Sequence, residues 1–430
     1  MDDAATLIPT RYTQEQHHID PSVFDRRAIA ICRQLHEAGY EAYLVGGCLR
    51  DTLLQQPPKD FDIATNARPE EIAALFRNCR LIGRRFRLAH LHYGRDIIEV
   101  ATFRASADEQ VKTDADGHVL EDNHYGTMEE DVLRRDFIIN SLYYDVQTGV
   151  LIDYLDALAD IRARQIRLIG TPSARYIEDP VRMLRAARFA AKLSMPLEAQ
   201  TQQAIASCRQ ELRAVPAARL FDEVQKLFMS GYGEKSYEIL RSFELFAMLF
   251  PDVDRIFSYK NKAFADYADR LIRSALQSTD QRIAHDQPVT VAFLFAAFLW
   301  PVYQLQYRGL LKTGMNWHSA MQESVDLVLI AAAERVSIPL RLRGMIREIW
   351  TLQARFELTG NSQKKIRGLL THPRFRAAYD FLVIRQKAGE ALDQSIAWWT
   401  AMQTEQQQYL EQPPVKNTKP RKSRNARRKS

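Results

Sequence analysis

The chain has 430 residues, of which 46% are hydrophobic and 26% charged, a composition typical of a soluble globular protein with about two to four compact units. Its most apolar run, Val289–Tyr303, is too short to cross a bilayer, and the N-terminus lacks the apolar core of a signal peptide. The four cysteines are scattered without Cys-x-x-Cys spacing, so we expect neither a zinc site nor a disulfide framework, and a cytoplasmic location without membrane contact.

The positive charge is concentrated at the C-terminal end of the chain. The formal net charge is +6, whereas residues 411–430 alone contain eight Lys or Arg and one acid, which gives +7. The remaining chain is therefore close to neutral. The same segment is rich in Pro and poor in apolar residues, so we predict a disordered basic tail over 411–430.

The first 155 residues predict an α+β unit with short strands. After a flexible leader over residues 1–22, apolar spacing predicts a helix over 23–38 that Gly39 ends. The predicted elements that follow are a strand at 42–45, a strand at 59–63, a helix at 69–76, a strand at 97–103 and a polar loop over 105–123. This α+β unit, the head, is predicted to span residues 23–155.

The pattern after residue 155 is helical throughout. Helical spacing of apolar residues recurs over 180–193, 200–212, 217–230, 234–249, 289–300, 318–335 and 376–388. We predict a helical neck over 156–230 and a helical body and leg over 231–410.

Asp60 and Asp62 form the most informative pair of residues in the chain. On a strand, residues two apart project from the same face, so both carboxylates would point to one side. Paired carboxylates suit Mg²⁺, which is bound through one or two carboxylates together with substrate phosphates. Upstream, Gly46 and Gly47 predict a turn whose amides approach a phosphate. A lone Asp-x-Asp is more often a pair of solvated turn residues or a helix cap. Whether this pair binds a metal is therefore judged from the neighbouring residues.

Those neighbours make residues 44–65 resemble the signature of the class II nucleotidyltransferases, a polymerase-beta-like branch that includes CCA-adding enzymes and bacterial poly(A) polymerases. The residues that carry the resemblance are Gly46, Gly47, Leu49, Arg50, Asp51, Asp60, Asp62, Ile63 and Thr65. Cys48 departs from the pattern, which usually has a small residue such as Gly there, and we expect the turn to form nevertheless. The resemblance implies a nucleotidyltransferase head followed by an all-α neck, body and leg, with Asp60 and Asp62 as catalytic ligands of Mg²⁺ or Mn²⁺.

Two residues are candidates for a third carboxylate, which two-metal phosphoryl transfer requires. Glu99 lies on the strand predicted at 97–103, whereas Asp136 lies in the block RRDFIIN, which also resembles the family. The resemblance favours Asp136, although this residue could instead cap a helix running towards Tyr144. Within the same block, Arg134 or Arg135 offers a forked donor for a triphosphate, and Asn140 could bond the sugar.

The segment EDPVRMLR (178–185) predicts how the nucleobase is read. Asp179 precedes Pro180 and could simply cap a helix. Three residues apart on one face, Asp179 and Arg182 present an acceptor beside donors, which matches the amino group and N1 of adenine. The resemblance implies that this Glu-Asp-x-x-Arg motif selects the base, and Arg185 extends a basic stripe along the helix.

Other stretches favour poly(A) polymerases over CCA-adding enzymes. Residues 77–95 contain six arginines and no acid, and residues 81–91 resemble the stretch that marks bacterial poly(A) polymerases. The resemblance continues through 215–220 and 371–379, and the basic tail over 411–430 fits an enzyme that holds a growing RNA by its phosphates. It implies template-independent addition of AMP from ATP to RNA 3′ ends, which promotes RNA turnover, by a monomer that could work with RNA-degradation proteins. The alternatives are CCA addition to tRNA and a non-catalytic RNA-binding protein.

Overall fold

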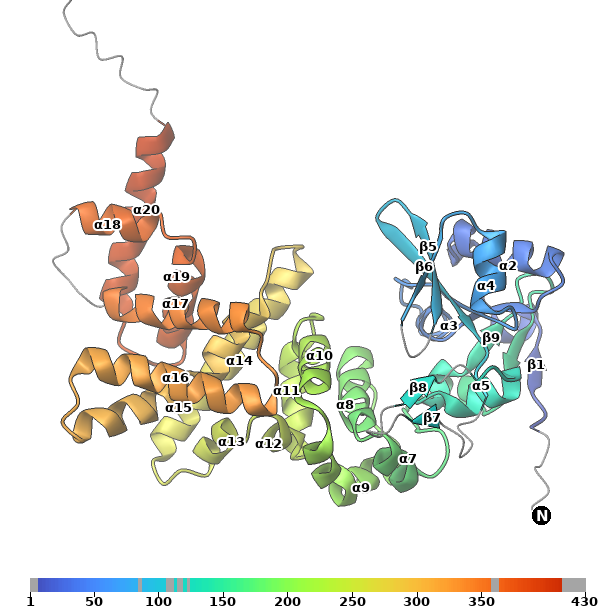
Figure 1. Cartoon of the computed structure of the whole chain (residues 1–430), viewed down its shortest axis with the longest axis horizontal. Helices are drawn as coiled ribbons and strands as arrows, with labels where there is room; N and C mark the ends of the chain where they lie inside the picture. Colours follow the sequence, from blue (N-terminus) through green and yellow to red (C-terminus); the bar gives the residue numbers. More distant parts are fainter. Residues whose placement is uncertain are drawn as a thin grey trace, which may run out of the picture. The chain divides into compact units, whose positions relative to one another are not determined.

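The computed structural model describes residues 7–83, 87–105, 112–113, 119–121, 124–356 and 363–411. The chain divides into two compact units, Met1–Pro251 and Asp252–Ser430. The predicted divisions at residues 155 and 230 both fall inside the first unit. The first unit contains the sheet and the helices that follow it, and the second contains only helices in its described part (Figure 1).

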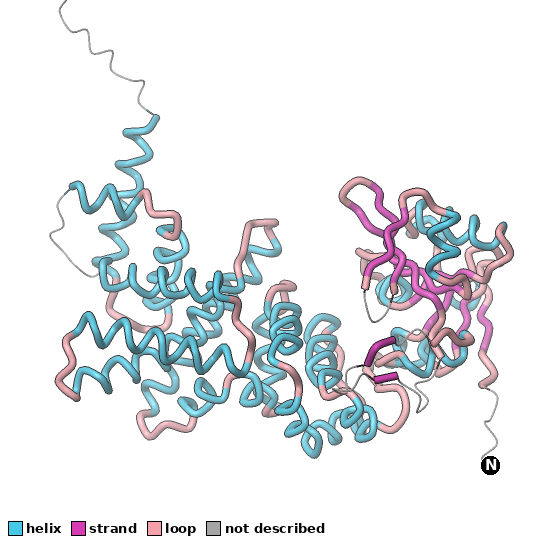
Figure 2. The backbone as a smooth tube through the Cα atoms, in the orientation of Figure 1, coloured by secondary structure: helices cyan, strands magenta, loops and turns pink. Residues whose placement is uncertain are grey.

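The strands of the head, magenta in Figure 2, form a mixed sheet. This sheet has eight strands in the order β1-β10-β9-β2-β3-β6-β5-β4. Its strands are β1 (Thr10–Tyr12), β2 (Ala42–Val45), β3 (Asp62–Thr65), β4 (Cys79–Ile82), β5 (Leu88–Tyr93), β6 (Asp96–Thr102), β9 (Leu142–Tyr144) and β10 (Leu151–Asp153). A separate pair, β7 (Lys112–Thr113) and β8 (Val119–Glu121), lies in the predicted loop 105–123, most of which is outside the described residues. Among the strands of this sheet in the described residues, β3 and β6 are the one parallel pair. The predicted α+β head is confirmed.

Two predictions about the head are wrong in detail. The leader predicted over 1–22 contains β1, which pairs antiparallel with β10, and the helix α1 (Gln14–His17). Three residues give no reliable strand pattern on their own, and their partner is about 140 positions away, so only tertiary pairing reveals them. The strand predicted at 59–63 instead begins at Asp62, which leaves Asp60 in the loop before it.

Helices that pack against the sheet stabilise the position of its strands. Helix α2 (Arg26–Glu37) begins at Asp25, whose carboxylate accepts a hydrogen bond of 2.7 Å from the Arg27 amide, and it buries one apolar face. The shorter helices of the head are α3 (Gly47–Leu53), α4 (Pro69–Leu75), α5 (Met128–Arg134) and α6 (Ala157–Ala163). The core between sheet and helices includes Val132, Tyr143 and Ile152.

The first unit continues with a compact group of helices. These are α7 (Pro172–Glu178), α8 (Val181–Leu193), α9 (Ala199–Cys208), α10 (Ala217–Phe228), α11 (Gly233–Ser242) and α12 (Leu245–Leu249). Helix α8 buries an almost continuous run of small and apolar residues and contacts both α10 and α11. The helices predicted at 180–193 and 217–230 are therefore confirmed with small shifts of their ends.

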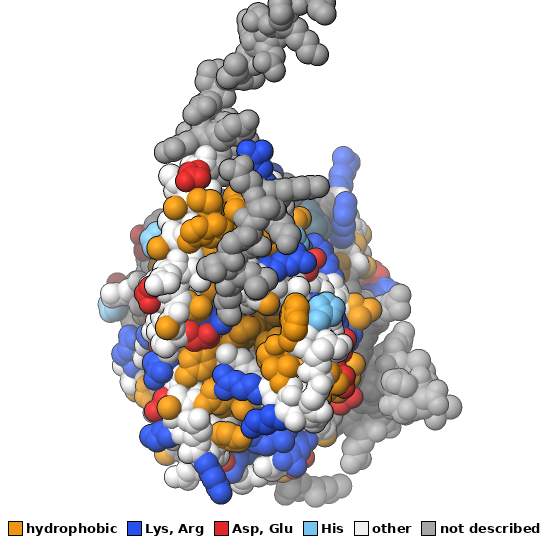
Figure 3. Space-filling model, turned by 90° about the vertical axis from the view of Figure 1, so that its left-hand side faces the viewer, with side chains coloured by type: hydrophobic (Ala, Val, Ile, Leu, Met, Phe, Trp, Pro, Cys, Tyr) orange, Lys and Arg blue, Asp and Glu red, His pale blue; other side chains and the backbone are white. Residues whose placement is uncertain are grey.

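The second unit is built from α13 (Pro251–Phe257), α14 (Lys262–Ala284), α15 (Val291–Lys312), α16 (Trp317–Arg335), α17 (Leu340–Phe356), α18 (Gln363–Leu370), α19 (Phe375–Lys387) and α20 (Asp393–Glu411). Aromatic packing holds α15 to α17, where the indole N–H of Trp350 donates to the Ala296 carbonyl at 3.0 Å. On the face seen in Figure 3, hydrophobic side chains lie among Lys and Arg. None of the helices in the described ranges has the length and apolar character of a membrane span.

Candidate active site

Three carboxylates gather where β3 begins. Asp62 is in register with Glu99 of the parallel strand β6, so the two side chains project from the same face of the sheet. Desolvation, followed by repulsion from Glu99 and Asp60, raises the pKa of Asp62 from 3.8 to about 6, while Arg135 acts in the opposite direction. The Glu99 carboxylate also lies 3.4 Å from the His90 ring nitrogen Nε2 on β5. Asp60, Asp62 and Glu99 therefore form one cluster of negative charge.

This cluster fits a divalent cation that takes its remaining ligands from substrate. The described residues contain no ready group of three or more His, Cys, Asp or Glu side chains that could hold a metal ion. Mg²⁺ needs fewer protein ligands, because it keeps waters and binds substrate phosphates through one or two carboxylates. After desolvation, repulsion from Glu99 and Asp60 contributes to the raised pKa of Asp62. A cation would relieve this repulsion, so the donor set fits the predicted metal.

The glycine turn lies directly beside these acids. Val45, the last residue of β2, is the register partner of Asp62, and Gly46 follows with φ +72°, a conformation that favours glycine. A side chain at Gly46 would also approach the Arg135 Nη1 atom to 3.6 Å. Cys48, the departure from the family pattern, is buried and its thiol donates to the Val45 carbonyl at 3.3 Å. The turn therefore forms as expected despite the cysteine.

Arg50 and Asn140 are bonded to each other. The Arg50 Nη1 atom donates to the Asn140 Oδ1 atom at 2.6 Å, and its Nη2 atom lies 2.5 Å from the Asp51 carboxylate. The guanidinium group also stacks over the Phe189 ring, with 5.3 Å to the centroid, and Lys192 lies 3.4 Å from Asp51. Arg50 is only 3% exposed. The residues predicted to contact phosphate and sugar thus belong to a network that links α3 to α8.

Of the two neighbouring arginines, Arg135 is the one close to the turn. Its guanidinium group contacts the Asp131 carboxylate at 2.9 Å and the Tyr143 hydroxyl at 3.0 Å, and it influences Asp62 electrostatically. The Arg134 guanidinium instead donates to the Ala105 carbonyl. The sequence left open which of the two arginines contacts the nucleotide, and this geometry favours Arg135.

Asp136 lies in an ion-pair network with α8 and not with the other acids. Its carboxylate contacts the Arg182 Nε atom at 3.2 Å and the Arg185 Nη1 atom at 2.6 Å. No helix runs from Asp136 towards Tyr144, because a 3₁₀ turn at Ile138–Asn140 and strand β9 occupy that segment, so the capping alternative is wrong. Asp136 therefore joins the head to α8, and the structure places Glu99 beside Asp62.

The two residues predicted to read the nucleobase have partners inside the protein. The Asp179 Oδ2 atom lies 2.6 Å from the Arg219 Nη2 atom at the start of α10, while its Oδ1 atom accepts from the Val181 amide at 3.2 Å. Arg182 donates to the Arg175 carbonyl at 2.9 Å and contacts Glu178 at 2.9 Å in addition to Asp136. Arg219 is not among the residues predicted for the site, although the stretch 215–220, which resembles the family, contains it.

Helix α8 carries its basic residues towards this network. Arg188 lies over the Phe189 ring, with 4.7 Å to the centroid, and burial lowers the pKa of Arg188. Burial, followed by the charge of Arg50, likewise lowers the pKa of Lys192. Together with Arg185 these side chains form a row of cations along one helix, close to the acids of the head.

Known proteins resemble the chain over most of its length. The family described as "Poly A polymerase head domain" matches residues 42–167, "Probable RNA and SrmB- binding site of polymerase A" matches 194–257, and "Polymerase A arginine-rich C-terminus" matches 313–430. Poly(A) polymerase I of Haemophilus influenzae is 46% identical over 396 residues, which cover 89% of this chain and 86% of that protein. A CCA-adding enzyme of Lactobacillus delbrueckii is 37% identical over 212 residues, 49% of this chain and 52% of that protein.

Solved structures show the same fold. The crystal structure of a Bacillus stearothermophilus CCA-adding enzyme in complex with CTP superposes with a TM-score of 0.56 at 23% identity. The alignment covers 90% of this chain and 83% of that one. The predicted order of a sheet-containing head followed by helices is therefore shared with this group of proteins.

Proposed function

The chain belongs to the bacterial poly(A) polymerase family, and from this premise we propose how its residues add AMP from ATP to RNA 3′ ends without a template. The activity rests on the identity of 46% across 86% of a poly(A) polymerase I. The observation that carries the proposed site is the cluster of Asp60, Asp62 and Glu99 beside the glycine turn.

The acids at the start of β3 would hold the metal. We assign Asp60 and Asp62 as ligands of Mg²⁺, or of Mn²⁺, and Glu99 as the third catalytic carboxylate in place of Asp136. Bound there, the cation would neutralise phosphate charge and favour ionisation of the attacking hydroxyl. The register pairing of Asp62 with Glu99 supports this choice, because Asp136 already compensates two guanidinium groups.

The triphosphate would lie against the turn. The Gly46 amide donates to the Leu142 carbonyl at 3.4 Å, so we assign the Gly47 amide, at the start of α3, to phosphate oxygens. Arg135 lies next to Gly46. Because Arg50 and Asn140 bond each other, we assign them to orient the sugar and phosphates through this fixed pair. Holding the reactants in line supplies much of the rate in a reaction without a covalent enzyme intermediate.

Adenine would be read by Asp179 and Arg182. An Asp179 carboxylate oxygen accepts from the N6 amino group after it exchanges Arg219 for the base, and an Arg182 donor turns from its internal acceptors to N1. Asp136 positions Arg182 and Arg185, so it affects base selection without contacting the reacting atoms.

The reaction then follows from these positions. The RNA 3′ oxygen forms a bond to the α-phosphorus of ATP, the bond between this phosphorus and the bridging oxygen breaks, and pyrophosphate leaves. The proton of the 3′ hydroxyl passes to solvent or to a neighbouring carboxylate. Repetition of the cycle extends the RNA by adenylates.

The cellular setting is also a proposal. All four cysteines lie within the described residues as free thiols, which supports a reducing cytoplasm. We propose a monomer that meets RNA-degradation proteins there, and light scattering after gel filtration would test the oligomeric state.

An assay of nucleotide choice on two primers tests the function. Oligoadenylate and a tRNA lacking its 3′ end are incubated with each of the four nucleoside triphosphates and Mg²⁺. We expect long ATP-dependent products on both primers. Products on tRNA that stop after three additions and require CTP would establish CCA addition instead. RNA binding without incorporation of any nucleotide would establish the non-catalytic alternative.

A further inference from the structure

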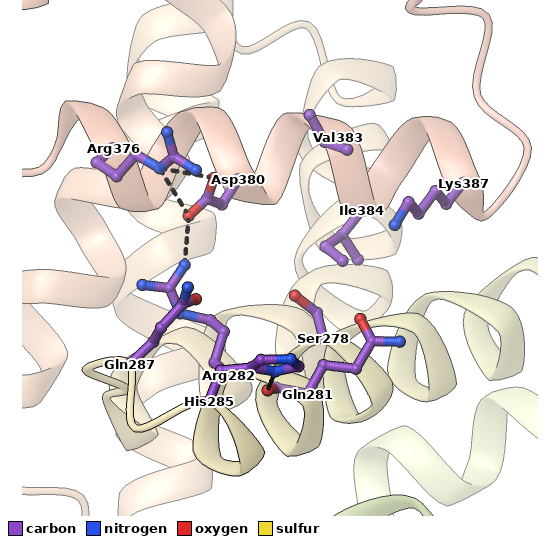
Figure 4. A pocket seen from close by; sticks show the side chains of 10 residues that line it. All are labelled: Ser278, Gln281, Arg282, His285, Gln287, Arg376, Asp380, Val383, Ile384 and Lys387. Atoms are coloured by element: carbon purple, nitrogen blue, oxygen red, sulfur yellow. Dashed lines mark hydrogen bonds and ion pairs between the residues drawn. The ribbon is translucent and has the colours of Figure 1, made fainter.

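A groove of about 490 Å³ lies in the second unit between α14 and α19 (Figure 4). Among its lining residues are Arg282 and His285 from α14 and its end, and Arg376, Asp380, Ile384 and Lys387 from α19. None of these residues belongs to the site described above. Residues 371–379 carried a family resemblance that the catalytic chemistry does not use, and Arg376 lies in that stretch.

The charges that line the groove are predominantly positive. Asp380 is its single acid, and the carboxylate is shared by two guanidinium groups, Arg376 Nε at 3.0 Å and Arg282 Nη1 at 3.4 Å. Lys387 has no ion-pair partner among the residues that the structure describes, and it is exposed. One carboxylate thus opposes three permanent cations, which leaves donors directed at solvent.

The shape of the groove fits a chain better than a single small anion. Arg376 and Lys387 are eleven positions apart on one helix, which corresponds to about 16 Å along its axis. One phosphate group cannot contact both side chains, whereas successive phosphates of a strand can. Between these two cations lie the half-buried Val383 and the buried Ile384, and the amide side chains of Gln281 and Gln287 lie opposite (Figure 4).

We propose that this groove is a second RNA site, which holds the backbone of single-stranded RNA upstream of the 3′ end. The inference rests on the proposed function, since that function brings RNA to the protein. Phosphates pair with Arg376, Arg282 and Lys387, and a base or ribose covers the half-buried Val383. The His285 Nδ1 atom donates to the Gln281 carbonyl at 2.7 Å, which leaves Nε2 as an acceptor for a ribose hydroxyl.

The test compares two double variants that each remove two positive charges. Arg376→Gln with Lys387→Gln changes the groove, and both side chains are exposed, so the fold should be retained. Arg255→Gln with Lys262→Gln is the matched control, because both residues are exposed cations of the same unit outside this groove. Binding of a fluorescent 20-residue oligoadenylate is measured by anisotropy over a range of salt concentrations without ATP.

The groove variant should bind about tenfold more weakly at 0.1 M salt, and its slope of log affinity against log salt should fall by about 1.4, because each phosphate contact on a single strand contributes about 0.7. The control variant should behave as wild type. The double variant Arg376→Lys with Lys387→Arg keeps both charges, so it should bind RNA as tightly as wild type. Melting temperatures of all variants show whether they are folded.

Unchanged affinity and slope in the folded groove variant would overturn the proposal and leave an acidic protein partner as the ligand of these cations. Competition by ATP alone that depends on the groove residues would also overturn it, in favour of a free-nucleotide site. Failure of the proposed function is separate, because it would show as wild type that binds RNA but adds no AMP. The groove variant itself should add AMP at the wild-type rate when the primer is saturating.

Discussion

Asp62→Asn should make the metal-free protein more stable and abolish its stabilisation by Mg²⁺. In the wild type, Asp62 lies beside Glu99 on the neighbouring strand and close to Asp60, and its pKa is raised from 3.8 to about 6. The folded protein therefore holds a proton at Asp62 more tightly than the unfolded chain does. Asparagine keeps the shape and removes the charge, so it removes the repulsion.

The sign of the effect follows from this shift. Because the folded pKa is higher, the metal-free wild type loses stability as pH rises from about 4 to about 6 and carries the full penalty at neutral pH. The shift corresponds to about 3 kcal/mol at 1.36 kcal/mol per pKa unit. The Asp62 side chain keeps contact with solvent, which screens the repulsion, so we expect about 1 kcal/mol.

Differential scanning calorimetry at pH 7.5 measures both effects. In EDTA, the variant should melt about 2 °C above wild type. With millimolar Mg²⁺ the order should reverse, because only the wild type gains binding energy from the cation. Asp266→Asn, which removes an exposed acid of the second unit, is the control for general charge effects. At pH 4, where Asp62 is protonated in the wild type, the difference between wild type and variant should disappear.

The reasoning would be refuted by an Asp62→Asn protein that melts below wild type in EDTA. It would also be refuted by equal stabilisation of both proteins by Mg²⁺. The first result would show that the negative charge has a stabilising partner, and the second that the cation binds elsewhere.

Four further predictions concern catalysis and RNA binding. Glu99→Gln should lower kcat for AMP addition about a hundredfold, as expected for the loss of a charge-stabilising group. Asp136→Asn should instead lower the free energy of unfolding in urea by about 2 kcal/mol and keep kcat within about tenfold of wild type. Equal losses of kcat in the two variants would return the third-carboxylate role to Asp136. Asp179→Asn should reduce the preference for ATP over the other nucleotides about tenfold in kcat/KM, because an amide donor faces the N6 amino group. Arg219→Gln should lower KM for ATP, because the ion pair of Arg219 with Asp179 competes with the base for the Asp179 carboxylate. A raised KM would show that Arg219 itself assists ATP binding. Removal of residues 411–430, of which 412–430 lie outside the described residues, should weaken RNA binding and reduce the slope of log affinity against log salt. An unaltered slope would show that the tail does not contact RNA phosphates.

Local sequence determined the elements that have their own pattern or end signals. Strand β2 forms at Ala42–Val45 as predicted, and α8 occupies Val181–Leu193 because thirteen residues with an apolar face and a preceding proline specify a helix on their own. The acid pair and the glycine turn were recognisable because their residues are close in sequence. Turn geometry and carboxylate spacing act over a few positions, so a single chain reports them directly.

The partners of the site residues were decided by tertiary structure alone. Glu99 is 37 positions from Asp62 and becomes its neighbour only because β6 pairs in parallel with β3. The ion pair of Asp179 with Arg219 and the pairing of β1 with β10 likewise join distant segments. Their positions depend on which strands and helices pack together, and that choice follows from burial summed over the whole unit and not from any short run of residues.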